Sequence, residues 1–273
     1  MARGSGTPWN TSGSGTASHS PGSPGGLRSK RTNPEAAVPP GLFLLGHPGY
    51  GGRVPRVRGF GDADGANGTF GAFRVIEQDA VAFEAFLQDT GEALGLDPEL
   101  IAAKLCGRWR NGVSLAVSGD QPEPGEVRLD RLNAFDYGSD PDGTRCPFGS
   151  HARRMHPRLH DTPAPARLLR RGLPYDPRFD PLRPDDGPRG LLGLFLCASL
   201  SEQFEFIMRE WLHNGLFGSV DPLVGGFDAP AFSFSDLDGH QHTVEVPRFV
   251  RTRGSAYLFY PSLTDLERMG RPV

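Results

Sequence analysis

The sequence is poor in cysteine and contains no long apolar run. Only three of the 273 residues are cysteine, and they lie far apart with no CxxC pair (Cys106, Cys146 and Cys197). This argues against a disulfide scaffold or a zinc cluster and fits a reducing compartment. No apolar run approaches the roughly 18 residues that a membrane span needs, so we expect no membrane partner.

Acidic residues are missing from the start of the chain. No Asp or Glu precedes Glu35, so the formal charge of −3 conceals a basic beginning and an acidic remainder. Residues 1–26 consist mostly of Gly, Ser, Thr and Pro, a composition that cannot bury enough apolar surface to offset the entropy cost of ordering. We predict that residues 1–37 are a disordered tail and that residues 38–273 form the folded domain. The tail lacks the apolar core of a secretory signal, so a cytoplasmic location is the default expectation.

Several later segments carry regular periodicity. Aromatic and β-branched residues predict a strand over residues 69–77, and a nearly continuous apolar run predicts a strand over 191–198 that is buried on both faces. Helices are predicted after Asp79, over 98–105 behind an Asp-Pro pair, and after the S-x-x-E capping box that begins at Ser199. The first of these helices is expected to end at Gly91.

The last part of the chain has the pattern of antiparallel strands. Residues 232–235 and 243–246 flank an Asp-Gly turn, which indicates a hairpin. Residues 249–252 and 256–260 suggest two more strands joined at Gly254. The expected order is alternating strands and helices followed by several antiparallel strands. This order predicts an α+β fold.

The middle of the chain is different. Residues 118–190 are rich in Pro, Asp, Gly and Arg with little periodicity, which is typical of a functional or disordered loop. Within it, residues 133–158 gather two histidines, four arginines, one cysteine and three aspartates. The residues alone leave several interpretations open besides a solvated basic loop. The histidines could bind a metal, Cys146 could supply a thiolate, or one histidine could bind the iron of a flat anionic cofactor whose carboxylates meet the arginines. The metal interpretation would use His151, His156 and His160.

One run within this segment also resembles a known motif. CPFGSHARRMHPR, from Cys146 to Arg158, is similar to the haem-ligand motif of the dye-decolourising (DyP-type) peroxidases. Further blocks resemble that family in the same order, and together they cover residues 38–263: PPGLFLLGHP, NGTFGAFRVIEQDAVAF, RRGLPY, RGLLGLFLCASLSEQFEFIMREW, DPLVGG and FVRTRGSAYLFYPSL. The resemblance implies two ferredoxin-like halves of the dimeric α+β barrel type, with the haem pocket mainly in the second half.

The resemblance also implies roles for individual residues on the side of the axial ligand. His151 matches the axial ligand of haem b iron, because imidazole can bind iron through one nitrogen while the other donates to a carboxylate. Asp221 is a looser match to that carboxylate. Arg158 matches an arginine that pairs with a haem propionate.

On the distal side of the haem, Arg170 matches the arginine that stabilises the negative charge which develops as the O–O bond of peroxide breaks. Leu194 and Phe195, followed by Leu196, match apolar residues of the distal face. The family also has a GxxDG motif whose aspartate moves a proton between the peroxide oxygens. The literal match here, Gly61 to Gly65 with Asp64, follows PPGLFLLGHP instead of preceding it. We therefore expect a complete second half and a truncated first half.

Two functions from different classes follow. The first is a haem peroxidase that oxidises aromatic, phenolic or dye-like reductants with hydrogen peroxide. The second is a haem-binding protein without peroxidase turnover. A protein that binds a metal without haem through the three histidines is a third, weaker alternative. No feature indicates a nucleic-acid partner, and an exposed sheet face would favour a homo-oligomer.

Overall fold

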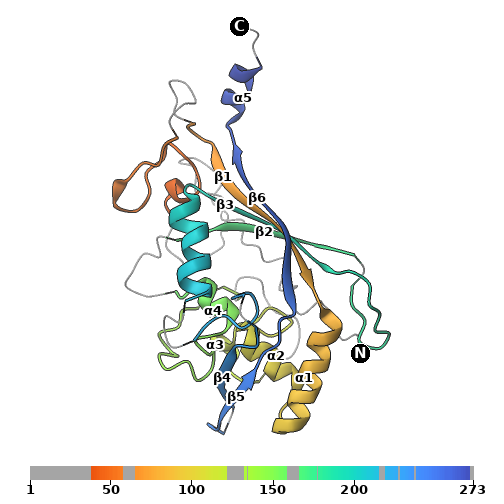
Figure 1. Ribbon diagram of the computed structural model, residues 1–273. Coiled ribbons are helices and arrows are strands. Elements are labelled where there is room, and N and C mark those ends of the chain that lie inside the picture. Colours follow the sequence, from red (N-terminus) through yellow and green to blue (C-terminus); the bar gives the residue numbers. More distant parts are fainter. Residues whose placement is uncertain are drawn as a thin grey trace.

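The computed structural model describes most of the chain after the predicted tail (Figure 1). The described residues are 38–57, 65–121, 132–133, 135–158, 166–176, 178–214, 219–226, 228–236 and 238–270. Residues 1–37 lie outside them, so the expectation of a disordered tail stays a prediction. In the described part of the chain, no helix combines the length and the apolar character that crossing a membrane would require.

A four-stranded antiparallel sheet forms the centre of the fold. Its strands stand in the order β2-β3-β1-β6, and they comprise Thr69–Gln78 (β1), Leu169–Tyr175 (β2), Gly190–Cys197 (β3) and Val250–Tyr260 (β6). Helical segments connect β1 to β2, and a helical rod followed by a separate hairpin connects β3 to β6, so the sheet strands and their helical connections follow the order strand, helix, strand, strand, helix, strand. This order with β1 and β3 at the centre is the ferredoxin-like topology, which confirms the predicted α+β fold.

The remaining elements surround this sheet and extend below it in Figure 1. The α-helices are Ala80–Leu94 (α1), Pro98–Cys106 (α2), Leu115–Ser118 (α3), His151–Met155 (α4) and Leu263–Met269 (α5). The connection from β3 to β6 begins with two π-helical segments that form one continuous rod, Leu200–Glu205 (η4) and Ile207–Leu212 (η5). A hairpin of β4 (Ala231–Ser235) and β5 (Gln241–Glu245) follows. Two short 3-10 turns, Pro40–Leu42 (η1) and Tyr50–Gly52 (η2), precede the sheet.

The two faces of the sheet differ. Phe204 of η4 packs on one face, where it contacts the ring of Phe195 at 5.4 Å and shares an apolar cluster with Ala72. The other face carries Leu194, Leu173 and further apolar residues, and Leu173 is 64% exposed. Strand β3 is therefore not buried on both faces, contrary to its apolar composition, because within the described residues no helix packs on the second face.

Two local predictions are also wrong in detail. Helix α1 continues past Gly91, which is buried against Pro98, and ends instead at Gly95, where the left-handed backbone (φ 68°) costs glycine little. The two strands expected around Gly254 are one strand, β6, because both parts pair with β1 across a bulge. The capping contacts are confirmed, since the Asp79 and Asp97 side chains accept backbone N–H groups at 2.9 Å.

Candidate haem site

His151 contacts a buried carboxylate that comes from a distant part of the chain. His151 is the first residue of α4, and its Nδ1 lies 2.6 Å from Oδ2 of Asp221, which is fully buried. The other carboxylate oxygen, Oδ1, accepts the backbone N–H groups of Leu223 at 2.9 Å and Val224 at 3.0 Å. When the neutral ring donates from Nδ1, its lone pair is on Nε2, the nitrogen that binds a metal in such His–carboxylate pairs.

Three arginines lie within electrostatic range of one another near this loop. Arg158 donates to the carbonyls of Asn133 and Phe135 at 3.0 and 2.9 Å. Arg108 donates to the Asn133 side chain at 3.0 Å, and both guanidinium groups lie over the Phe135 ring. Burial, together with repulsion from Arg158 and Arg170, lowers the pKa of Arg108 to about 10. The prediction from sequence missed Arg108; its only signal was a position directly after the glycine that caps α2.

Arg170 lies on edge strand β2 on the face of the sheet that η4 covers. It pairs with Phe195 of β3, so the two side chains share that face. Desolvation lowers the pKa of Arg170, and repulsion from Arg158 adds to this shift. Leu194 is the register partner of Arg171 and therefore lies on the opposite face. The expectation that Leu194 and Phe195 line one wall is thus wrong, because successive residues of a strand alternate between faces.

Several other candidates do not join this site. Cys146 is fully buried, and desolvation raises the pKa of its thiol to about 11, which argues against a thiolate. His156 contacts Arg167 at 2.9 Å, and His160 lies outside the described residues, as does Asp64, the predicted distal acid.

A different group has ligand atoms close enough for a metal ion. In the part of the chain that the structure describes, it consists of Asp236, Asp238 and His240, whose ligand atoms lie within 4.8 Å of one another. It lies at the turn of the β4–β5 hairpin and includes neither His151 nor His156. The third alternative needs His160, which lies outside the described residues, so it stays a prediction.

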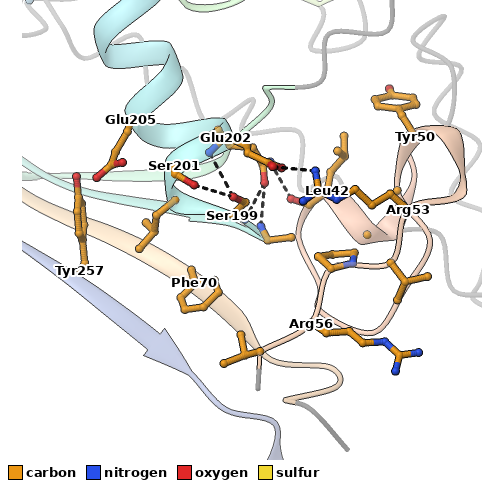
Figure 2. A pocket seen from close by; sticks show the side chains of 18 residues that line it. Leu42, Tyr50, Arg53, Arg56, Phe70, Ser199, Ser201, Glu202, Glu205 and Tyr257 are labelled. Carbon is orange, nitrogen blue, oxygen red and sulfur yellow. Dashed lines mark hydrogen bonds and ion pairs between the residues drawn. The ribbon is translucent and has the colours of Figure 1, made fainter. Parts of the chain in front are cut away.

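An open groove of about 770 Å³ lies on the same side of the sheet as η4. Figure 2 shows Tyr257 beside Glu205 at one end, Phe70 on the floor and an ion pair between Arg53 and Glu202, at 2.8 Å, near the other end. The groove flanks the beginning of η4, whereas α4 contacts η5 at the end of the rod. None of the predicted site residues lines it.

The chain is similar to known dye-decolorizing peroxidases, although no family model matches it. A dye-decolorizing peroxidase of Mycena epipterygia is 30% identical over 85% of this chain and 52% of its own length. The multifunctional dye peroxidase DyP2 of Amycolatopsis sp. is 33% identical over 74% of this chain and 49% of its own length. Solved dye-decolorizing peroxidases in complex with cyanide and with 2,6-dimethoxyphenol superpose with TM-scores of 0.74 and 0.72, each at 27% identity. Both cover 85% of this chain, and 57% and 56% of the respective solved chains.

The chain therefore shares the ferredoxin-like α+β fold of the haem peroxidases of the dye-decolorizing type. The resemblance noted in the sequence is confirmed, because the chain is similar to curated dye-decolorizing peroxidases over most of its own length. It spans about half the length of the curated relatives that it matches.

Proposed function

We propose that this chain binds haem b through His151 and acts as a peroxidase toward small aromatic reductants. The observation that carries the proposal is the 2.6 Å contact between His151 Nδ1 and the buried carboxylate of Asp221. A buried aspartate that accepts from imidazole makes the ring a stronger electron donor and fixes its orientation, which is what an iron ligand requires. The similarity to peroxidases over most of the described chain supports the same conclusion.

The charged residues around the site fit the rest of the cofactor. Haem b carries two propionates, and the arginines Arg108, Arg158 and Arg170 lie within electrostatic range of one another. Gathering three cations is unfavourable by itself, and a dianion would offset their repulsion. In the proposal, Arg158 and Arg108 attract the propionates, and the ring of Phe135 holds both guanidinium groups in place.

When bound, haem supplies the redox chemistry by which hydrogen peroxide accepts two electrons and two protons and becomes two molecules of water. Two reductant molecules supply these electrons one at a time, and a phenol that gives up one electron also releases its proton. Arg170 is the residue of this chain proposed to face the peroxide, where a fixed guanidinium stabilises the negative charge on the departing oxygen. Phe195 is the apolar neighbour of Arg170 on the same face, across the β2–β3 ladder.

A second function is haem binding without peroxidase turnover. It is favoured by the order of the sequence blocks, since the one GxxDG stretch follows the PPGLFLLGHP block. Loss of a general acid–base group costs roughly 10²–10⁴ in rate. The two functions therefore predict the same haem spectrum and different turnover.

Both functions are tested by titrating the purified chain with haemin and following the Soret band. We expect one haem per chain, and a loss of affinity in His151→Ala larger than the roughly 10–100-fold that removal of an outer-shell partner costs. His156→Ala is the matched control, because this histidine of the same loop contacts Arg167. Unchanged affinity in His151→Ala would overturn the assignment. Peroxide and 2,6-dimethoxyphenol, the ligand of one solved relative, then separate the peroxidase from the protein that only binds haem.

A further inference from the structure

The loop that leads to His151 is held by two buried cations. Three successive backbone carbonyls each accept a hydrogen bond from one of them. Lys104 donates from Nζ to the carbonyls of Thr144 at 3.1 Å and Arg145 at 3.0 Å, and Arg153 donates from Nη1 to the carbonyl of Cys146 at 2.7 Å. The Lys104 side chain is fully buried and that of Arg153 is 8% exposed.

Each cation is neutralised by its own buried carboxylate. Lys104 lies 2.7 Å from Asp120, and Arg153 lies 2.8 Å from Asp140. Asp140 completes the arrangement from the other side, because its two oxygens accept the backbone N–H groups of Arg145 and Cys146, both at 3.0 Å. The backbone of this loop is thus fixed by side chains and not by regular secondary structure.

Arg153 is also fixed by its aromatic neighbours. Its guanidinium lies 4.4 Å from the centres of both the Tyr137 and the Phe148 rings. A second donor, Nη2, reaches the backbone carbonyl of Asp140 at 2.9 Å. A planar group with several fixed donors constrains its partners more tightly than the single ammonium of a lysine does.

These contacts matter for His151 because α4 cannot hold its own direction. The helix has only five residues, from His151 to Met155, and helices this short are not stable by themselves. Its N-cap residue, Ser150, makes no side-chain cap and instead donates its hydroxyl to the carbonyl of Lys104. The direction in which the His151 side chain leaves the backbone therefore depends on what holds the preceding loop and the first turn, and Asp221 Oδ2 then holds the ring itself.

We propose that Arg153 with Asp140, supported by Lys104 with Asp120, are positioning residues that set the direction of the His151 ring. The inference rests on the proposed function, because the ring must be aimed at an iron for its direction to matter. Burying two ion pairs is costly, and a pair of apolar residues would often serve stability equally well. The charged groups add directional hydrogen bonds to the backbone carbonyls of Thr144, Arg145 and Cys146, and these bonds fix the geometry of the loop.

The test compares three variants with the unchanged chain. Arg153→Met removes all donors at nearly the same volume, and Arg153→Lys keeps the charge but loses the planar fork. Arg145→Met is the matched control, because Arg145 is an exposed residue of the same loop. Amide hydrogen exchange over residues 144–152 is measured without haem. The electron paramagnetic resonance spectrum and the iron–histidine stretching frequency are measured with haem bound.

We expect exchange over 144–152 to become about tenfold faster in Arg153→Met, which corresponds to roughly 1.4 kcal/mol of local opening free energy. With haem, the same variant should show a broadened or second set of resonances and a shifted iron–histidine frequency. Arg153→Lys should give smaller changes of the same kind, and Arg145→Met should give none. If Arg153→Met does not fold, Arg153→Lys decides by the same two measurements.

Exchange and spectra of Arg153→Lys equal to those of the unchanged chain would overturn the positioning role. Equal changes in the Arg145→Met control would overturn it as well, since the effect would then be one of charge in general. Failure of the unchanged chain to bind haem through His151 counts against the proposed function instead, and the titration of His151→Ala identifies that case separately.

Discussion

Replacing Asp221 by asparagine should weaken haem binding while leaving the fold almost intact. The two carboxylate oxygens accept hydrogen bonds from different groups. Oδ1 accepts the backbone N–H groups of Leu223 and Val224, and Oδ2 accepts the Nδ1–H of His151. An asparagine keeps its oxygen in the first position, because two buried N–H groups would otherwise lose their acceptor. Its NH₂ group then faces His151 Nδ1, which must become an acceptor.

The proton of the neutral imidazole consequently moves to Nε2, the nitrogen proposed to bind iron. Loss of such an outer-shell partner costs about 10–100-fold in affinity, or about 1.4–2.7 kcal/mol. The free energy of unfolding should fall by less, about 1 kcal/mol, because a charge-assisted hydrogen bond is replaced by a neutral one. That corresponds to a melting temperature lower by about 2–4 °C.

The measurement is a haemin titration of Asp221→Asn together with thermal unfolding of the chain without haem. Asp228→Asn is the control, since that carboxylate is exposed and pairs with Arg248 at 3.2 Å. Asp221→Ala should be much less stable than Asp221→Asn, because it leaves two buried N–H groups unsatisfied at about 1–3 kcal/mol each. Affinity within twofold of the unchanged chain, with an identical Soret band, would refute the reasoning.

Three further outcomes follow from the same structure. Arg170→Ala should reduce peroxidase turnover by roughly 10²–10³ with haem still bound, whereas Arg171→Ala, on the opposite face of β2, should not; equal effects in stopped-flow assays would contradict this. Burial raises the pKa of the Cys106 thiol to about 12, and the other two cysteines are also buried. The native chain at pH 8 should therefore resist iodoacetamide until urea exposes all three thiols, and rapid native labelling would speak against it. Gly41→Ala should destabilise the chain by about 1–3 kcal/mol, since its Cβ would collide with the backbone carbonyl of His47; an unchanged urea midpoint would disprove the collision.

Local signals in the sequence predicted the elements that depend on local chemistry. Strand β1 follows from its aromatic and β-branched residues, and α2 follows from Asp97 and Pro98 at its start. The rod that begins at Ser199 is capped as predicted, with the hydroxyl accepting the N–H of Glu202 at 3.2 Å. Caps and periodicity act over three or four residues, so they can be read without knowledge of the rest of the chain.

Long-range pairing decided what those signals could not. Strand β2 contains Gly172 and Pro174, which disfavour a strand, yet it pairs with β3 along its whole length. Proline is tolerated there because β2 is an edge strand, and only the sheet order shows that. Long-range pairing also makes β6 one strand, since its ladder with β1 continues past the bulge near Gly254.

The candidate site shows the same division. The motif around His151 was evident in the sequence, but Leu194 and Phe195 were both expected on the distal face, and strand β3 places them on opposite faces. Asp221 was only a loose match in the sequence, because its contact with His151 spans 70 residues. Its distance of 2.6 Å depends on how the loop after η5 is anchored by Leu223 in the core. The sequence by itself therefore determined which residue types were available for chemistry, and only the tertiary structure, through packing between distant segments, decided which of them meet.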